Sequence, residues 1–205
     1  MLETLFSQYE RYPKHEVVME IIAIVFGLMS VWFAKKDNIF VFPTGIISTS
    51  FYTYLLWKWA LLGDMMINAY YVIMSVVGWY YWSLTKEGSL KFPISRITNN
   101  EKKQAISLFS ATVIFVILVY NFFNYTITWI SVIDIFVTGL FFVGMWLMTK
   151  RRIENWILLI IGDIVSIPMY FIKGYTFTCI LYLLLTIIAV FGYMEWKKTI
   201  KQEKI

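Results

Sequence analysis

Charged residues are scarce in this chain: Lys, Arg, Asp and Glu make up only 15% of its 205 residues. Hydrophobic residues make up 60% and aromatic residues 20%. A soluble globular domain usually carries about a quarter charged residues, because its surface must interact with water. The composition therefore excludes a soluble domain and predicts a protein embedded in a membrane.

Residues that carry enzyme chemistry are also few. The chain has a single cysteine, Cys179, and a single histidine, His15, and it has no Gly-rich phosphate loop and no Cys/His cluster. ATP hydrolysis and metal catalysis need such motifs. Cys179 falls within the last apolar run and is predicted to be a packing residue. We therefore expect no cofactor, no metal site and no catalytic residue.

Long apolar runs make up most of the chain. Each is close to the length of about twenty residues that spans a bilayer as a helix at about 1.5 Å per residue. They predict an all-α membrane protein with seven transmembrane helices, forming a single transmembrane domain over 1–205. Before the first run, the helical spacing of Leu2, Leu5, Phe6 and Tyr9 predicts a short interfacial helix. The runs cover 17–34, 39–57, 65–84, 105–123, 127–148, 156–172 and 175–194.

The distribution of positive charge predicts how the chain is oriented. With seven crossings, one side of the membrane receives 35–36, 86–103, 150–152 and the C-terminal tail, which hold all but four of the 18 Lys and Arg. Positive loops stay in the cytoplasm, so we expect the N-terminus outside and the C-terminus in the cytoplasm. The net charge of +5 is then an orientation signal and a contact with membrane lipid, not a nucleic-acid patch. The nine Trp fall near the ends of the runs, as in an aromatic belt.

The two halves of the chain resemble one another. Matched residues stand at one constant separation along the sequence, and the apolar runs fall into the same register. We expect repeat one at 17–84, a linker helix at 105–123 that restores the chain direction, and repeat two at 127–196. Such a 3+1+3 parallel repeat is typical of transporters, with the substrate site between the repeats. The matched pairs are Glu20 and Asp134, Trp32 and Trp146, Gly78 and Gly192, and Trp82 and Trp196.

Polar side chains inside the apolar runs predict a cavity, because a polar group at bilayer depth is costly unless it lines one or bonds a neighbour. They fall at helical spacing on four runs. Asp163 lies near the middle of its run, where an ionised carboxylate costs on the order of 3 kcal/mol. Purely structural roles compete: Asp163 can bond its neighbours, Ser75 and Thr186 can bond helix carbonyls, and Trp156 can belong to the aromatic belt. The candidate substrate-binding residues are Thr49, Tyr52, Asn68, Tyr71, Ser75, Trp156, Asp163, Ser166, Tyr170, Tyr182 and Thr186.

Over nearly its whole length the chain resembles the Pnu family of vitamin transporters. The resemblance rests on Gly63-Asp64 leading to Asn68, on Gly78-Trp-Tyr-Tyr-Trp82, and on Glu154-Asn-Trp156 through Asp163, Ser166 and Tyr170. It implies a SWEET-like 3+1+3 fold, a homotrimer and a place in the bacterial inner membrane. It also implies facilitated diffusion of an unphosphorylated vitamin, which a cytoplasmic kinase traps and, for nicotinamide riboside, passes to NAD biosynthesis.

The family motif Trp-x-x-Trp-x-x-x-Asn/Asp is met only in part. Trp156 and Asp163 match its ends, but Leu159 replaces the second Trp, and Asn68 stands where riboside transporters often carry Gln. Nicotinamide riboside and thiamine carry a cationic ring that suits aromatic faces beside a carboxylate, whereas riboflavin is neutral and larger. We expect nicotinamide riboside, with thiamine or riboflavin as alternatives.

Two other classes of function compete with a transporter. A membrane-embedded enzyme has only Asp163, Glu20 and Asp134 for acid-base chemistry and lacks a nucleophile. A structural or receptor protein has no evident use for a polar cavity between two repeats. Uptake into sealed vesicles distinguishes the three, because only a transporter moves the ligand inside.

Overall fold

The computed structural model describes residues 13–59, 62–86, 89–90, 92–172 and 176–202. The interfacial helix predicted around Leu2–Tyr9 lies outside these residues. The described part of the chain holds seven helices and one short hairpin. The elements are α2 (Lys14–Lys35), α3 (Val41–Lys58), α4 (Leu62–Ser83), β1 (Thr85–Lys86), β2 (Ser89–Leu90), α5 (Asn99–Phe122), α6 (Trp129–Thr149), α7 (Glu154–Ile172) and α8 (Thr176–Gln202).

Each predicted apolar run therefore forms a helix, because a backbone in hydrocarbon must satisfy its own hydrogen bonds. Five of the described helices, α2, α5, α6, α7 and α8, are long and apolar enough to cross a membrane. The helices α3 and α4 are not in that group. They carry polar residues within the span, such as Ser48, Thr49, Asn68 and Ser75, and these lower the hydropathy of both helices.

The helices extend beyond the apolar runs. Helix α5 begins at Asn99, six residues before the predicted start, and α8 continues to Gln202. Thr98 caps α5: its Oγ1 accepts a hydrogen bond from the Glu101 amide at 3.2 Å, and the Glu101 carboxylate accepts one from the Thr98 amide at 3.0 Å. The two bonds form a capping box. Hydropathy marks where hydrocarbon ends, whereas capping and helix propensity decide where the helix ends.

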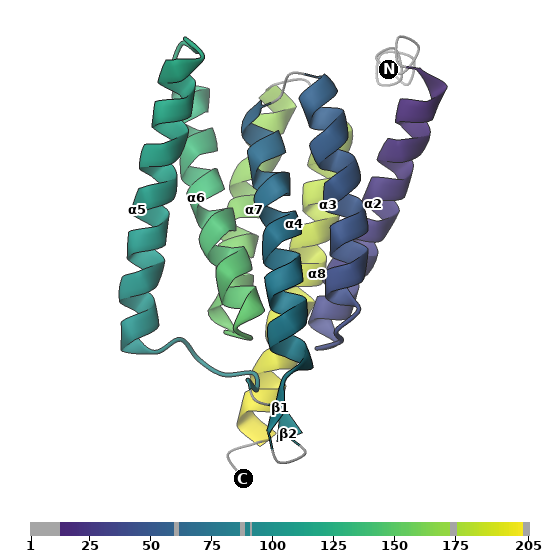
Figure 1. Cartoon of the computed structure of the whole chain (residues 1–205), viewed down its shortest axis with the longest axis vertical. Helices are drawn as coiled ribbons and strands as arrows, with labels where there is room; N and C mark the ends of the chain where they lie inside the picture. Colours follow the sequence, from purple (N-terminus) through teal and green to yellow (C-terminus); the bar gives the residue numbers. More distant parts are fainter. Residues whose placement is uncertain (1–12, 60–61, 87–88, 91, 173–175, 203–205) are drawn as a thin grey trace.

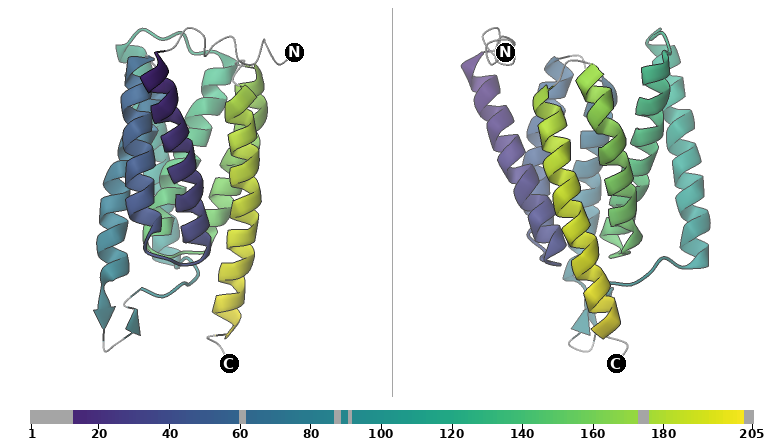
Figure 2. Two further views of the ribbon diagram at one scale, coloured as in Figure 1. Left: turned by 90° about the vertical axis from the view of Figure 1, so that its right-hand side faces the viewer. Right: turned by 180° about the vertical axis from the view of Figure 1, so that it is seen from behind.

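Six helices form a closed ring (Figures 1 and 2). Helix α3 packs between α2 and α4, and α7 packs between α6 and α8. The two groups of three meet at two seams, α2 against α8 and α4 against α6. Helix α5 stands outside the ring against α6, and the two ends of the chain lie at opposite ends of the molecule. The interior of the ring is therefore enclosed by residues of both groups.

The segment between α4 and α5 crosses the end of the molecule that carries the C-terminus (Figure 1). It contains the antiparallel strands β1 and β2, which the sequence analysis did not predict. It then fastens to the turn between α6 and α7. The Ser95 amide donates to the Arg151 carbonyl, and the Ile153 amide donates to the Ser95 carbonyl, both at 3.0 Å. The segment connects the two groups of helices and is itself bonded to the second.

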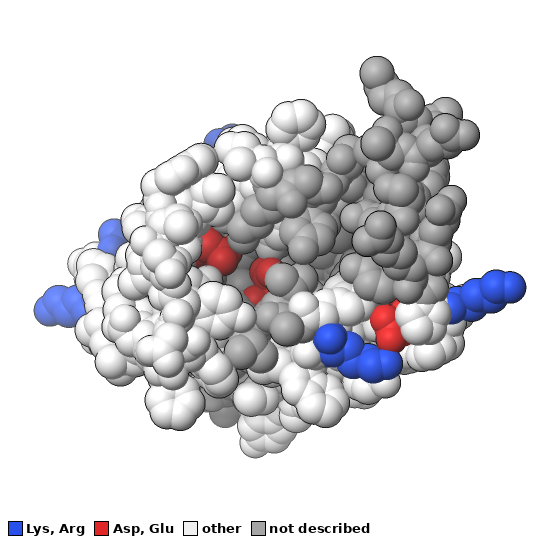
Figure 3. Space-filling view, turned by 90° about the horizontal axis from the view of Figure 1, so that it is seen from above, with Lys and Arg blue, Asp and Glu red and all other residues white. Residues whose placement is uncertain are grey.

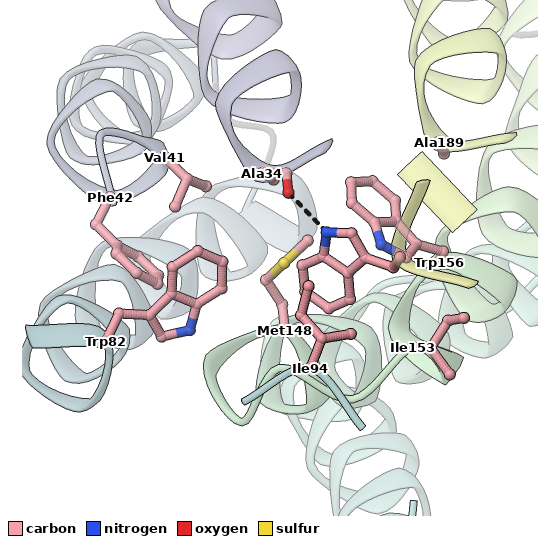
Figure 4. Packing of buried hydrophobic residues seen from close by; sticks show 10 residues of the cluster. Ala34, Val41, Phe42, Trp82, Ile94, Met148, Ile153, Trp156 and Ala189 are labelled. Atoms are coloured by element: carbon pink, nitrogen blue, oxygen red, sulfur yellow. Dashed lines mark hydrogen bonds between the residues drawn. The ribbon is translucent and has the colours of Figure 1, made fainter. Parts of the chain in front are cut away.

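Buried tryptophans close the ring at this same end (Figure 4). Trp82 meets Phe42 edge-on at 5.0 Å between ring centroids, and Trp156 meets Trp196 edge-on at 5.5 Å. All three indoles are at most 2% exposed. The aromatic-belt interpretation of the nine Trp therefore does not hold for these three, of which Trp156 was also a site candidate. Their position near helix ends does not show whether the helix turns them outward or inward.

Indole hydrogen bonds link the two groups of helices at the closed end. The Trp196 indole donates to the Ala34 carbonyl at 3.0 Å, as the dashed line in Figure 4 marks, and the Trp82 indole donates to the Thr149 carbonyl at 3.2 Å. Each bond runs from the C-terminal part of the third helix of one group, α8 or α4, to the C-terminal end of the first helix of the other, α2 or α6. A buried indole N–H needs such a partner, so these bonds fix how the two groups meet.

Two glycines make this close packing possible. A methyl group on Gly78 would collide with the Phe42 ring, and a methyl group on Gly192 would lie 2.7 Å from the Trp156 ring. These are two of the residues that matched between the halves of the sequence. In both groups a glycine near the end of the third helix admits an aromatic ring from the second.

Candidate substrate cavity

A cavity of about 390 Å³ lies inside the ring, and all six ring helices contribute to its lining. This volume is within the range of about 300–1,000 Å³ typical of small-molecule sites. Its lining begins near the N-terminal end of the molecule, at Trp59, Asp64 and Thr178, and runs down to Ala34 and Met148 beside the buried tryptophans. Figure 3 shows the hollow from the N-terminal end, with acidic side chains inside it.

Most of the predicted site residues line this cavity. They come from α3, α4, α7 and α8, and the ring turns their polar faces toward one another. The helical spacing noted in the sequence thus identified the inward faces of these helices. The predicted residues that border the cavity are Thr49, Tyr52, Asn68, Tyr71, Ser75, Asp163, Tyr170 and Tyr182.

The remaining three predicted residues do not border the cavity. Trp156 is fully buried against Trp196 and Gly192. Ser166 is fully buried, and its hydroxyl has no hydrogen-bond partner among the described residues. Thr186 donates to the Tyr182 carbonyl at 2.8 Å. Helical spacing allowed them to share the inward face, but the neighbouring helices cover that part of the helix surface.

Other lining residues were not predicted as site residues. Glu20, which the sequence analysis named only as the match of Asp134 and a candidate acid-base group, borders the cavity. Asp64 lies one turn before Asn68 on the same face of α4, a spacing that could have identified it. On α2, the small residues Gly27 and Ser30 border the cavity at helical spacing. Asp134, the sequence match of Glu20, accepts a hydrogen bond from the Tyr120 hydroxyl at 3.0 Å and belongs to the packing of α5 on α6.

Carboxylates dominate the charge of the cavity. Glu20, Asp64 and Asp163 border it, and none of the described lining residues is Lys or Arg. Asp163 is 5% exposed, and no described residue donates a hydrogen bond to its carboxyl. Asp64 accepts a hydrogen bond of 2.6 Å from the Tyr170 hydroxyl. An uncompensated buried carboxylate is costly, so this cavity favours a positively charged or hydrogen-donating ligand.

Aromatic rings form the wall beside Asp163. Tyr182 stacks between two rings, with Phe141 at 6.1 Å and 8° and Tyr170 at 5.3 Å and 18°. Across the seam between α4 and α6, the Tyr71 hydroxyl donates to the Phe141 carbonyl at 3.3 Å. This bond holds the Tyr71 ring against the opposite group of helices. Flat aromatic faces next to a carboxylate form a site for a planar cationic ring.

Each end of the ring carries an ion pair. At the N-terminal end, the Lys58 ammonium lies 2.7 Å from the Glu16 carboxylate, and this lysine is 37% exposed. At the closed end, the Arg151 guanidinium donates to Asp37 at 2.8 Å. The Arg151 side chain is only 3% exposed, and it lies over the Trp82 ring at 4.0 Å. The cation is therefore buried in the closed-end pair and partly exposed in the other, whereas the acids show the opposite order, with Asp37 26% and Glu16 6% exposed.

A comparison with known proteins now identifies the family. The family described as "Nicotinamide mononucleotide transporter" matches residues 17–198. The chain belongs to this family. Its members are transporters and not enzymes, which confirms both the predicted resemblance and the predicted absence of an enzymatic role. With several helices apolar enough to span a bilayer, the protein is a multi-pass membrane transporter.

Individual relatives carry different substrates in their names. The chain is 20% identical to the nicotinamide riboside transporter PnuC of Escherichia coli (strain K12), covering 87% of this chain and 84% of that protein. It is 19% identical to the riboflavin/roseoflavin transporter RibM of Streptomyces davaonensis, covering 90% and 87%. It also resembles the crystal structure of the vitamin B3 transporter PnuC with a TM-score of 0.71 at 22% identity, over 98% of this chain and 90% of that one. The last likeness concerns the fold.

Proposed function

We propose that this protein is a facilitator that imports an unphosphorylated B vitamin, and that nicotinamide riboside is its substrate. The observation that carries the proposal is the cavity itself. Carboxylates and tyrosines border it, and its described lining residues include no Lys or Arg. Nicotinamide riboside has a planar cationic ring, which Asp163 and the stacked Tyr170 and Tyr182 suit, and hydroxyls for Asn68, Thr49 and the other polar lining groups.

The same charges argue against a phosphorylated substrate. A phosphate group is usually held by Arg, Lys or a helix N-terminus. In this cavity it would instead approach Glu20, Asp64 and Asp163 at low dielectric, where like charges repel strongly. We therefore expect nicotinamide riboside to bind and nicotinamide mononucleotide to be rejected. A cytoplasmic kinase would then trap the vitamin after entry.

Riboflavin is a second candidate, and thiamine a third. The RibM relative matches this chain over as large a share as PnuC does. In addition, Leu159 borders the cavity where the family motif carries a tryptophan, and a smaller side chain leaves room for a larger ring system. Thiamine shares the cationic ring of nicotinamide riboside, so the carboxylates suit it as well.

Alternating access is the transport mechanism that we propose. In this structure the cavity meets the N-terminal end, whereas Trp82, Trp196 and the pair Arg151–Asp37 seal the other end. With the N-terminus outside, as the loop charges predict, this is an outward-facing state in the bacterial inner membrane. Opening the sealed end would release the vitamin inward, without ATP and down its gradient.

We also infer that the two groups of three helices are the predicted parallel repeats, 17–84 and 127–196, joined by the linker helix α5. Matched positions support this. Gly78 meets Phe42 as Gly192 meets Trp156, and each of the four stands at the same separation from its counterpart. Asp37 and Arg151, which are also counterparts, both end a first helix with left-handed backbone, at φ 52° and 53°. Assembly into a homotrimer in the lipid bilayer remains an expectation from the resemblance.

Binding by the purified protein tests the substrate. Isothermal titration against nicotinamide riboside, nicotinamide mononucleotide, thiamine and riboflavin should show binding of the first and none of the second. In sealed vesicles, labelled nicotinamide riboside should level off at the external concentration. Accumulation well above that level without an ion gradient would contradict facilitated diffusion, and tightest binding of riboflavin would favour the second candidate.

Orientation has its own test. A reporter fused after Ile205 should be active only in the cytoplasm, because the positive loops and the C-terminal tail are predicted to lie there. Activity of a periplasmic reporter at the same position would reverse the topology, and with it the direction in which the cavity faces.

A further inference from the structure

The cavity reaches Gly45 of α3 between Ser30 of α2 and Ser75 of α4, and we call this part of its wall the recess. An ideal methyl group on Gly45 would lie 3.0 Å from the Ser30 hydroxyl oxygen and 3.4 Å from the Ser75 hydroxyl oxygen. Gly45, Ser30 and Ser75 all border the cavity. Two hydroxyls from different helices thus converge on a glycine at the cavity wall, where a side chain would be crowded.

The two hydroxyls differ in what they can still bond. Ser30 donates its hydrogen to the Val41 carbonyl at 2.7 Å, so its oxygen is left as an acceptor. Ser75 is 2% exposed, and no hydrogen bond joins its hydroxyl to any described residue. A serine within a helix can usually satisfy itself on the carbonyl one turn earlier, as Thr49 does with Gly45 at 2.7 Å. Because Ser75 borders the cavity, its hydroxyl is free to bond a ligand there.

The corresponding place in the other group of helices shows that the fold does not require this recess. The residues at the same sequence separation are Gly144, Leu159 and Ala189. There a methyl group on Gly144 would lie 3.2 Å from the Leu159 side chain, so the leucine occupies the space. The same helix arrangement thus packs well with an apolar side chain and without a hydroxyl. Packing alone does not explain why one group carries two hydroxyls beside a glycine at the cavity wall.

We propose that the recess formed by Ser30, Gly45 and Ser75 is a subsite for a hydroxyl group of the vitamin. Ser75 supplies a free donor and acceptor, Ser30 supplies an acceptor, and Gly45 has no side chain to cover the two hydroxyls. Gly45 lies one helical turn, about 5.4 Å, closer to the sealed end than Thr49. A ligand whose charged ring lies beside Asp163 and the tyrosines therefore places its hydroxyls toward the sealed end. This inference rests on the proposed vitamin-binding function and adds which part of the ligand is selected, and where.

A binding cycle between protein and ligand tests the subsite. The variant Ser75→Ala removes one hydroxyl and is titrated with the vitamin that the wild type binds most tightly. The same titration is repeated with analogues of that vitamin that each lack one hydroxyl. Loss of one neutral hydrogen bond should weaken binding of the parent vitamin about three- to tenfold. For the analogue that lacks the hydroxyl bound by Ser75, Ser75→Ala should not weaken binding further, because the hydrogen bond to Ser75 is already missing.

Gly45→Ala provides a second, steric variant. Its methyl group narrows the recess, so it should weaken binding of the parent vitamin more than binding of the analogue that lacks the selected hydroxyl. Ser110→Ala is the matched control, because Ser110 is exposed on α5, outside the ring. All variants are checked for a monodisperse peak and an unchanged melting temperature, so that misfolding is recognised.

Each outcome decides between the claims. Two results would contradict the subsite in a protein that binds the vitamin. Either Ser75→Ala weakens binding of the parent vitamin and of every analogue by the same factor, or it weakens binding of none of them. If the wild type binds none of nicotinamide riboside, thiamine and riboflavin, the proposed function fails, and the subsite fails with it. If either variant is misfolded, the other gives the result, because a smaller side chain and a larger one disturb packing in opposite ways.

Discussion

The two groups of helices share a packing pattern but line the cavity with different chemistry. All the glycines and serines of the lining come from α2, α3 and α4, beside larger side chains such as Tyr52 and Ile67, whereas α6, α7 and α8 supply mainly large apolar and aromatic ones. One wall therefore offers hydrogen bonds, and the other offers surfaces for stacking, with Asp163 at its side. The first set includes Gly27, Ser30, Gly45, Ser48, Thr49 and Ser75, and the second includes Phe141, Met145, Leu159, Tyr182 and Leu185.

A contact between the first two helices of each group shows how the difference arises. A methyl group on Gly27 would lie 2.9 Å from the Ser48 hydroxyl, and a methyl group on Gly162 would lie 2.5 Å from the Phe141 ring. Gly27 and Phe141 are counterparts in sequence, as are Ser48 and Gly162. The glycine is on the first helix in one group and on the second helix in the other. Close helix packing is kept while the side chain that occupies the contact changes from a hydroxyl to an aromatic ring.

Such asymmetry has a consequence for binding. A cavity with two identical walls would hold a ligand equally well in two orientations. Nicotinamide riboside is itself asymmetric, with a charged planar ring at one end and a sugar at the other. Unlike walls can therefore select a single orientation, and the next experiments test how much each wall and each end contributes.

The largest effect is expected at the sealed end. Asp37→Ala leaves the Arg151 guanidinium without its ion-pair partner while 97% of its side chain stays shielded. Breaking a buried pair by removing one partner costs on the order of 3–5 kcal/mol, and we expect about the lower figure because Asp37 is 26% exposed. Thermal unfolding in detergent measures the loss. A melting temperature equal to that of the wild type would show that the pair contributes nothing to closing this end.

The glycines that admit aromatic rings should come next. Gly78→Ala and Gly192→Ala each force a methyl group against Phe42 or Trp156, and overpacking of this kind costs about 1–3 kcal/mol. Both should lower the melting temperature, with Gly78→Ala the more severe because its methyl group would overlap the ring. Combining Gly78→Ala with Phe42→Leu should recover part of the loss. If only one glycine proves sensitive, the two groups do not share the packing pattern described here.

A somewhat smaller effect is expected at the charged part of the cavity. Asp163→Asn keeps the shape of the side chain and removes its charge, so a charge-assisted contact with a cationic vitamin should weaken by about 1.5–3 kcal/mol, roughly ten- to hundredfold in affinity. Asp134→Asn is the matched control, because Asp134 bonds Tyr120 and does not border the cavity. Unchanged binding by Asp163→Asn would leave recognition to the tyrosines. Loss of folding would instead support a structural role for Asp163.

The smallest effect is expected for the ion pair at the N-terminal end. Glu16→Gln removes a charge next to Lys58, which is 37% exposed and can turn to water, and the glutamine oxygen can still accept the hydrogen bond of the Trp59 indole. An ion pair whose cation reaches water contributes little to stability and is screened by salt. The melting temperature should change far less than for Asp37→Ala, and the difference should shrink further at high salt. An equal loss for both variants would mean that burial does not distinguish the two ends.

Several features of this protein could be predicted from sequence because they depend on local chemistry. An apolar run must become a helix in hydrocarbon, so the number and order of helices followed directly. Thr98 and Glu101 form a capping box whose two hydrogen bonds need only four consecutive residues. Asn68, Tyr71 and Ser75 share one face of α4 because helical spacing places them there. Their common border on the cavity was therefore predictable.

Other features depended on which helices meet, and only the tertiary structure decided them. Trp156 has the same place near a helix end as a lipid-facing tryptophan, but α8 offers Gly192 opposite it, and the ring is buried. Asp134 and Glu20 match in sequence, yet Asp134 accepts a hydrogen bond from Tyr120 of α5, whereas Glu20 borders the cavity. The unlike walls arise in the same way, because Gly27 and Gly45 each face a serine, whereas Gly144 and Gly162 face Leu159 and Phe141. Sequence thus determined which faces are polar, and packing between distant helices determined which polar groups remain open to a ligand.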